Sequence, residues 1–393
     1  MTARNAAETP SAPPTLRDVV AVLNQLYPPA LAAEWDAVGL VCGEPSQVVR
    51  RILFAVDPVP AVAAEAIERG VDLLVTHHPL YLRGTSSVAA TTAKGRVVHE
   101  LIRAGIALFT AHTNADHASP GVSDALAAAL GVTELRPLAP LPAQPTDKLV
   151  TFAPADAVER ILDALSAAGA GAIGAYSRCA WTTDGIGTFR PNPGAHPTIG
   201  AIGRIATVPE VRVEMVLPRA RRDAVIAALL AAHPYEEPAY DVIPLAERPG
   251  LAGTGRIGRL NRPESLAHFV DRVRAALPAT PAGGRYAGDP DRLVHIVAVC
   301  GGAGDGYLQT AAGAGADVYV TADLRHHPAS EITAETGIAL VDMPHWATEW
   351  PWLPDAAARL REALGAVGTT VSIEVSTLVT DPWDGRIPGG GSR

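Results

Sequence analysis

The sequence of 393 residues has few of the side chains that common catalytic mechanisms require. Its three cysteines, Cys42, Cys179 and Cys300, are isolated and lack the CxxC spacing of a thiolate zinc site. An odd number of isolated cysteines fits a reducing compartment better than a disulfide framework. Lys94 and Lys148 are the only lysines, and the GxSxG elbow of serine hydrolases is absent. Schiff-base, Walker-type and serine nucleophile mechanisms are therefore poorly supported.

Positive charge and long apolar runs are also scarce. The 32 lysine and arginine residues are outnumbered by 41 aspartate and glutamate residues, which gives a formal net charge of -9 at pH 7. Nucleic-acid binding needs clustered basic groups, so nucleic acid is not an expected partner. No apolar run is long enough to cross a bilayer, and the opening segment lacks the apolar region of a signal peptide. We therefore expect a cytoplasmic protein without a membrane partner.

The regular alternation of short apolar runs and helical patterns predicts the fold class. Hydrophobic residues make up 48% of a chain that is long enough for two domains. Strands predicted over 51–57, 71–76 and 106–112 alternate with helices predicted over 59–70 and 94–105. Such alternation favours βαβ units and a mostly parallel sheet, and the same rhythm returns near the C-terminus. The sequence therefore predicts an α/β protein.

The middle of the chain follows a different order. Residues 146–250 predict strand, helix, two strands, helix and strand, which is the βαββαβ plan of an α+β ferredoxin-like domain. The proline-rich stretch 135–147 is predicted as a linker, because proline cannot continue a helix or a central strand. We therefore expect one α/β core in two halves, 1–145 and 251–393, with an inserted domain between them.

Histidines and carboxylates at the ends of several predicted strands indicate a metal site. His77 and His78 follow a buried strand directly, and a bound cation would keep these neighbouring imidazoles neutral. Asp116 follows a second strand, where its carboxylate could bridge two cations or simply cap a turn. His345 and Glu349 are four residues apart and share one face of a helical turn. These donors suit one divalent transition metal, or two.

Other histidines are candidates for supporting roles. His112 and His117 follow the second strand and could orient the ligands through hydrogen bonds. His326 and His327 follow a further strand, and Asp323 beside them could position substrate, activate water or cap a helix. We expect His112, His326 and His327 to be the available proton carriers for catalysis.

These motifs occur together in the order of a known family. The segments WDAVGL, THHPLY, AHTNADHASPGVSDALA, CGGAGD, TADLRHH and DMPHWATE resemble the GTP cyclohydrolase I type 2 family, also called the NIF-three-like family, over nearly the whole chain. The middle segment, with GAYSRCAW, GTFRPNPGAHPTIG and HPYEEPAYDV, is similar to the PII-like or CutA-like insertion of the longer members. The chain departs from the frequent patterns WDNVGL and HTNLD at Ala37 and Ala115, neither of which is an expected ligand.

The resemblance implies a specific metal centre and assembly. It implies a NIF-three-like α/β core and a dinuclear site in which Glu349 bridges the two ions. The ligand positions that correspond in this sequence are His77, His78, Asp116, His345 and Glu349. It also implies a ring-shaped homohexamer whose sites face an internal cavity. Zinc is the first expectation for both ions, although iron, manganese and nickel suit the same donors.

Two classes of function are compatible with these residues. The first is a metal-dependent hydrolase acting on GTP or a related nucleotide or phosphoester, since two metals would lower the pKa of a bound water. The alternative is a metal-binding regulatory or scaffold protein without turnover. In that case the inserted domain would gate the cavity, and Tyr235, Glu236 and Glu237 would mark an interface.

Overall fold

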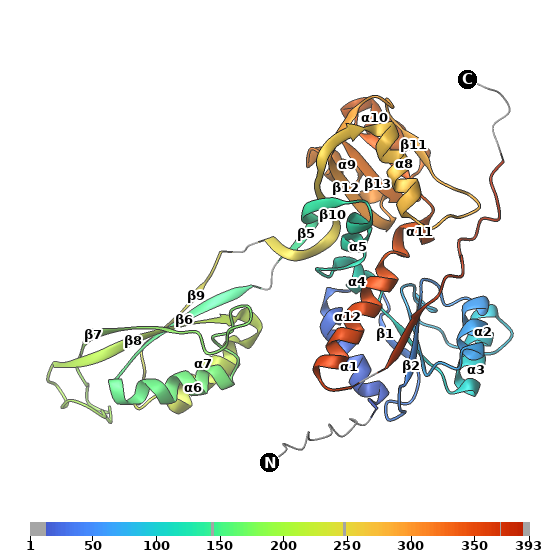
Figure 1. The fold of residues 1–393 in the computed structure, drawn as a ribbon. Coiled ribbons are helices and arrows are strands. Elements are labelled where there is room, and N and C mark those ends of the chain that lie inside the picture. Colours follow the sequence, from blue (N-terminus) through green and yellow to red (C-terminus); the bar gives the residue numbers. More distant parts are fainter. Residues whose placement is uncertain (1–12, 143–144, 247–248, 370, 388–393) are drawn as a thin grey trace, which may run out of the picture. The chain divides into compact units, whose positions relative to one another are not determined.

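The computed structural model describes residues 13–142, 145–246, 249–369 and 371–387 (Figure 1). The chain forms two compact units. Unit 1 consists of Met1–Leu141 with Leu251–Arg393, and unit 2 consists of Pro142–Gly250. Most of the opening segment lies outside the described residues, so its expected lack of a signal peptide stays a prediction. Where the chain is described, no helix has both the length and the apolar composition to cross a membrane.

The first sheet of unit 1 carries parallel strands that are buried on both faces. Its order is β1-β4-β3-β2-β15, in which β15, β2, β3 and β4 are parallel and β1 is antiparallel to β4. The strands are β1 (Gly39–Cys42), β2 (Arg51–Ala55), β3 (Leu73–Thr76), β4 (Ala107–Thr110) and β15 (Ser372–Val375). Nearly every residue of β2, β3 and β4 is buried, because helices cover both faces of the sheet. The helices are α1 (Leu16–Leu26) and α12 (Trp352–Ala366) on one face, and α2 (Pro60–Glu68) and α3 (Ala93–Ala104) on the other (Figure 1).

The second sheet of unit 1 has a parallel centre with antiparallel flanks. Its order is β11-β14-β13-β12-β10-β5, with β12, β13 and β14 parallel. The strands are β5 (Val132–Pro142), β10 (Pro249–Ser265), β11 (Arg285–Ala287), β12 (Leu293–Ala303), β13 (Val318–Ala322) and β14 (Ala339–Asp342). The helices against it are α5 (Val122–Ala129), α8 (Leu266–Ala276), α9 (Leu308–Gly313) and α10 (His326–Thr336). The predicted α/β fold class is confirmed.

The linker prediction over 135–147 was wrong for its first and last residues, and residues 143 and 144 lie outside the described residues. Residues up to Pro142 belong to β5, and β6 begins at Thr146. β5 is the last strand of its sheet, where the missing N–H groups of Pro137 and Pro140 are tolerated. β5 leads into unit 2 and β10 leads out of it, and the two strands are neighbours in the sheet. The strands that precede and follow unit 2 in the sequence are therefore paired in the second sheet.

Unit 2 is a four-stranded antiparallel sheet with two helices. The strand order is β7-β8-β6-β9, and each neighbouring pair is antiparallel. In chain order the elements are β6 (Thr146–Ala153), α6 (Val158–Ala167), β7 (Trp181–Phe189), β8 (Ala206–Pro218), α7 (Arg222–Ala232) and β9 (Tyr240–Pro244). Leu149 and Val213 of the sheet are buried together with Leu165 of α6 and Leu229 of α7, so unit 2 has its own core.

Candidate metal centre

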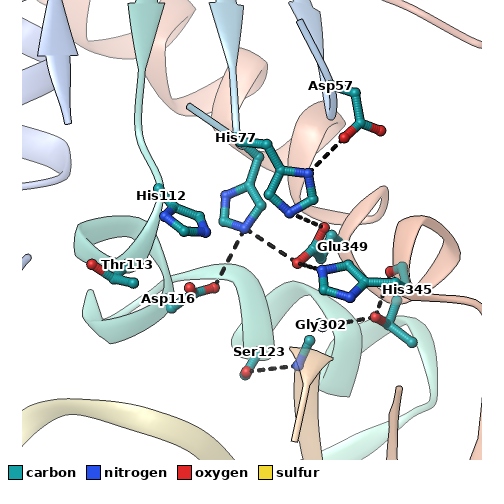
Figure 2. A network of polar contacts seen from close by, with 12 residues as sticks. Asp57, His77, His112, Thr113, Asp116, Ser123, Gly302, His345 and Glu349 are labelled. Atoms are coloured by element: carbon teal, nitrogen blue, oxygen red, sulfur yellow. Dashed lines mark hydrogen bonds and ion pairs between the residues drawn. The ribbon is translucent and has the colours of Figure 1, made fainter. Parts of the chain in front are cut away.

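Segments from both sheets of unit 1 bring imidazole and carboxylate groups together. His77 and His78 directly follow β3, and His112 follows β4 at the start of the short helix α4 (Thr113–His117). The short helix α11 (His345–Glu349) follows β14 of the second sheet. Figure 2 shows the side chains from these segments converging on Glu349. The carboxyl ends of parallel strands therefore supply the site, as expected for open α/β sheets.

The carboxylate of Glu349 lies at the centre of the cluster. Its Oε1 atom is 2.9 Å from Nε2 of His345 and 3.4 Å from Nε2 of His77. Its Oε2 atom is 3.2 Å from Nε2 of His78. Asp116 is on the opposite side of His77, with Oδ1 at 3.7 Å from Nε2. All five residues that were predicted as metal ligands thus lie together in this structure.

Two overlapping sets of side chains have the spacing of metal ligands. His77, His78 and His112 form one set, and His78, His345 and Glu349 form the other. In each set the potential ligand atoms all lie within 4.8 Å of one another. His78 belongs to both sets, so the two candidate positions are adjacent. Such a donor set of imidazoles and a carboxylate suits divalent transition metals.

Hydrogen bonds at the far side of each imidazole orient it toward the centre. Nδ1 of His78 is 2.7 Å from Asp57, and Nδ1 of His112 is 2.8 Å from Asp36. Nδ1 of His345 is 2.7 Å from Oδ2 of Asp323, and Nδ1 of His77 is 2.9 Å from the carbonyl oxygen of Ala111. These partners are acceptors, so Nδ1 carries the proton. In its neutral form each ring therefore presents the Nε2 lone pair to the site, as metal-binding histidines do.

Three buried polar atoms at the centre have no hydrogen-bond partner among the described residues. They are Nε2 of His77, Oδ1 of Asp116 and Oε2 of Glu349. Leaving a buried polar atom unpaired costs about 1–3 kcal/mol, and more for charged groups. A cation held by either ligand set would offset the unpaired charge of the carboxylates nearby; Asp116 belongs to neither set and lies 3.7 Å from Nε2 of His77. The residues present therefore fit a bound metal ion.

In the metal-free cluster, neighbouring charges shift the pKa values of the histidines and of Glu349. Burial acts to lower the pKa of His78, but the charge of Glu349 and the hydrogen bond to Asp57 outweigh it and raise that pKa to about 10. The pKa of His345 is raised to about 11 for the corresponding reasons, with Asp323 as the second acceptor. Burial acts to raise the pKa of Glu349, but the neighbouring imidazoles hold it well below its usual range. Without metal, His78 and His345 are therefore protonated, and their positive charge balances the negative charge of Glu349.

Gly302 in the CGGAGD turn leaves room for these side chains. It adopts a φ of +70°, which favours glycine, and its N–H donates to Oγ1 of Thr348 at 2.8 Å. A Cβ atom built at Gly302 would lie 2.4 Å from Oε1 of Glu349 and 3.1 Å from Nε2 of His345. The turn thus approaches the centre so closely that no side chain is tolerated.

The histidines predicted as proton carriers are not all at the centre. His112 belongs to one of the two ligand sets. His326 and His327 begin α10, are exposed, and contact each other edge to face with 5.2 Å between ring centroids. They lie outside both ligand sets found in the described part of the chain. His117, predicted to orient ligands, has its Nδ1 at 2.6 Å from the carbonyl oxygen of Leu31.

A family model matches most of this chain. The match covers residues 14–382, and the family is described as Duf34/NIF3 (NGG1p interacting factor 3). The chain belongs to the Duf34/NIF3 family. The family membership expected from the sequence motifs is thus confirmed, including the alternative name of GTP cyclohydrolase 1 type 2 that relatives carry.

Several curated and solved proteins are similar to this NIF3 family member over nearly their full length. A Mycobacterium tuberculosis protein named GTP cyclohydrolase 1 type 2 homolog is 53% identical over 370 residues, which is 94% of this chain and 96% of the relative. A Bacillus subtilis protein of the same name is 40% identical over 331 residues, covering 84% and 88%. The crystal structure of a Bacillus cereus protein related to NIF3 superposes with a TM-score of 0.78 at 37% identity, covering 95% and 99%.

Sequence reasoning missed two carboxylates of this NIF3 centre. Asp57 ends the run that forms β2, and Asp36 is the second residue of the WDAVGL motif. Asp36 also accepts hydrogen bonds from the N–H and hydroxyl groups of Thr113, and these contacts with His112 and Thr113 lower its pKa against the effect of burial. The available signals were the strand-end position of Asp57 and the presence of Asp36 in a family motif. Asp323 was named from the sequence, and its contact with His345 gives it an orienting role.

Proposed function

We propose that this NIF3 family protein binds two divalent metal ions and is a metal-dependent hydrolase acting on GTP or a related nucleotide or phosphoester. The observation that carries the proposal is the position of Glu349. One of its oxygens is near His77 and His345, and the other is near His78. A carboxylate shared in this way can bridge two ions and offset part of their charge. In the proposed site the ligands are His77, His78, Asp116, His345 and Glu349, and zinc is the first candidate metal.

The chain's own residues would shape the reaction around such ions. When bound, the two ions would lower the pKa of a water and polarise an oxygen of the substrate. Asp36, Asp57 and Asp323 would keep three imidazoles in their metal-binding tautomer. His112 is the predicted proton carrier that lies at the centre, whereas His326 and His327 would act only on a substrate that reaches the start of α10.

Two features support a nucleotide as the substrate class. Trp35 is 62% exposed, and its ring packs edge to face against His112 with 6.0 Å between the centroids. An exposed indole beside the centre offers a flat surface on which a purine base could stack. The relatives' printed name, GTP cyclohydrolase 1 type 2 homolog, refers to the same substrate class.

The proposal is tested by metal content and turnover together. Protein purified from cells should hold about two divalent ions per chain, and His77→Ala or Glu349→Ala should lose most of them. GTP and a panel of phosphoesters should then be assayed with the metal that the protein carries from the cell. Full metal retention in both variants would remove the site assignment. A metal-dependent product that disappears in both variants would support the hydrolase.

A metal-binding regulatory or scaffold protein is the second candidate. The exposure of His326 and His327, outside both ligand sets, favours this candidate. Most of the acid and base groups near the centre are then candidate ligands or hydrogen-bond partners of those ligands, so few are free to transfer protons. On this reading the ions would control assembly or partner binding. Two bound ions with no product from any substrate of the panel would select this function.

We also propose the assembly and location that the family resemblance implied. The proposal is a ring-shaped homohexamer in the cytoplasm, with unit 2 as an inserted ferredoxin-like module. The βαββαβ element order and the strand order β7-β8-β6-β9 support the module. The three free cysteines are compatible with a reducing compartment. Native mass spectrometry gives the number of chains, and a mass other than six chains would contradict the ring.

A further inference from the structure

The segment that follows β15 is anchored along the first sheet. Ser376 is buried, and its N–H donates to the carbonyl oxygen of Phe54 at the end of β2, at 2.7 Å. Its hydroxyl donates to Glu65 of α2 at 2.6 Å. The indole N–H of Trp350, next to the ligand Glu349, donates to the carbonyl oxygen of Ser376 at 3.0 Å. The chain beyond Ser376 is therefore held at the sheet edge where the candidate metal centre lies.

Four residues further on, this segment contacts Asp57, the carboxylate that accepts a hydrogen bond from the candidate ligand His78. The hydroxyl of Thr380 donates to Oδ2 of Asp57. The other oxygen of Asp57, Oδ1, accepts from Nδ1 of His78 at 2.7 Å. The two oxygens of one carboxylate are thus used by two different partners, one on each side. A continuous chain of hydrogen bonds leads from Thr380 through Asp57 to His78.

The next residue, Asp381, also has a buried carboxylate oxygen. Oδ2 of Asp381 is buried and has no hydrogen-bond partner among the described residues. Its pKa is raised, first by burial and then by the negative charge of Asp57 and, to a smaller extent, Asp323. These are the carboxylates that hold His78 and His345.

We infer that Thr380 is a positioning residue of the metal centre, which fixes the carboxylate of Asp57 and through it the imidazole of His78. The inference rests on the proposed metal binding. Rotation of the Asp57 carboxylate about its terminal bond would move Oδ1 away from Nδ1 of His78, and the hydroxyl of Thr380 restrains that rotation from the other oxygen. An imidazole held in one orientation needs less reordering when an ion binds, so Thr380 raises the affinity for the ion.

Metal affinity measured by competition with a chelator tests this role. Replacement of a residue that holds a ligand typically weakens metal binding by about 10–100-fold, which is the loss expected for Asp57→Asn. Thr380 acts one hydrogen bond further out, so Thr380→Val should weaken Co²⁺ binding by a smaller factor, about 3–10-fold. Thr380→Ser keeps the hydroxyl and should restore the affinity. The visible spectrum of the Co²⁺-loaded protein should change in Thr380→Val and return in Thr380→Ser.

The chain contains a matched control for this substitution. Thr377 is in the same segment, is exposed, and makes no side-chain hydrogen bond within the described residues. Thr377→Val should leave both the affinity and the Co²⁺ spectrum unchanged. Thermal unfolding of the metal-free variants shows whether Thr380→Val has simply loosened the segment. Equal Co²⁺ affinity and spectrum in Thr380→Val and Thr377→Val would overturn the inference.

A double-mutant cycle separates this inference from the proposed function. Because Thr380 acts through Asp57, adding Thr380→Val to Asp57→Asn should cause no further loss of affinity. Fully additive losses would show that Thr380 does not act through Asp57, and the inference would fail while metal binding stands. If the wild-type chain itself bound no Co²⁺, Zn²⁺ or Mn²⁺, the proposed function would fail first.

Discussion

Oε1 of Glu349 lies 2.9 Å from Nε2 of His345, which is one helical turn earlier on α11. The two side chains share a helix face because they are four residues apart. The same carboxylate is 3% exposed and also faces His77 and His78, which come from the other sheet. A single buried carboxylate therefore connects the candidate ligands of both sheets, and protons on the imidazoles or bound cations would balance its charge.

Replacing Glu349 by glutamine should empty the site while keeping its shape. The substitution removes the charge that faces three imidazoles but changes the volume very little. We expect the bound metal to fall from about two ions per chain to well below one, as measured by elemental analysis of purified protein. Glu335→Gln on the exposed side of α10 is the matched control and should keep its metal. Equal metal content in the two variants would contradict the central role of Glu349.

A methyl group at Gly302 should disturb both stability and metal binding. Gly302→Ala would place Cβ against Glu349 and His345 at a positive φ, so we expect a loss of about 1–3 kcal/mol in the free energy of unfolding, together with weaker metal binding. Gly313 ends α9, and a Cβ atom built there would meet no other atom within 4 Å. Gly313→Ala should be neutral or slightly stabilising. Urea unfolding and metal analysis of both variants check this; a Gly302→Ala protein as stable and metal-rich as wild type would refute the steric argument.

The clustering of the candidate ligands could be predicted from the sequence because their positions follow from simple rules. His77 and His78 come directly after a continuous apolar run, and such a run forms a buried parallel strand. His345 and Glu349 needed only helical spacing. The position of His326 and His327 outside the cluster has an equally local cause. His326 and His327 also follow an apolar strand, but the chain turns at Asp323, which adopts a φ of +58°, and only Asp323 reaches His345.

The residues that hold the ligands could not be predicted in the same way. Asp36 is 76 residues from its partner His112, and Thr380 is 323 residues from Asp57. Contacts at such separations depend on the packing of whole elements, which no local pattern records. The placement of β15 beside β2 is a further example, since a C-terminal strand completes the N-terminal sheet. Periodicity indicated a strand there but not its neighbour.

Metal binding near neutral pH should release protons. The pKa values of about 10 for His78 and about 11 for His345 mean that both imidazoles are protonated in the metal-free protein at pH 7 to 8. Because a metal binds the neutral ring, ions must displace these protons, and the apparent affinity should rise with pH. Calorimetric titrations in buffers of different ionisation enthalpy give the number of protons released. Identical binding enthalpies in all buffers would count against this prediction.

The same pKa shifts predict how the stability of the metal-free protein depends on pH. A folded-state pKa above the unfolded value of about 6.5 means that the folded state binds protons more tightly. The contribution of His78 and His345 is therefore fully present below about pH 6.5 and is lost as the pH rises toward 10 to 11. Denaturant unfolding of metal-stripped protein should show this decline. In a His78→Gln variant the part of the slope that comes from His78 should disappear.

Arg256 should be among the most sensitive positions outside the metal centre. Its side chain is 1% exposed, pairs with Asp124 at 2.7 Å, and donates to the carbonyl oxygens of Gly253, Gly255 and Ala118. Arg256→Ala would leave these acceptors buried and unpaired, which is expected to cost about 3–5 kcal/mol in the free energy of unfolding.

A second arginine on β10 provides the comparison for Arg256. Arg259 is largely exposed and lies 3.6 Å from the exposed carboxylate of Glu134, so Arg259→Ala should cost less than about 1 kcal/mol. Ala118 follows α4, which carries Asp116, so Arg256→Ala should also weaken metal binding and Arg259→Ala should not. An exposed ion pair such as that of Arg259 contributes little to stability, so the difference between the two variants measures the contribution of the buried pair of Arg256 and Asp124. Similar unfolding midpoints for the two variants would show that this buried pair does not stabilise the protein.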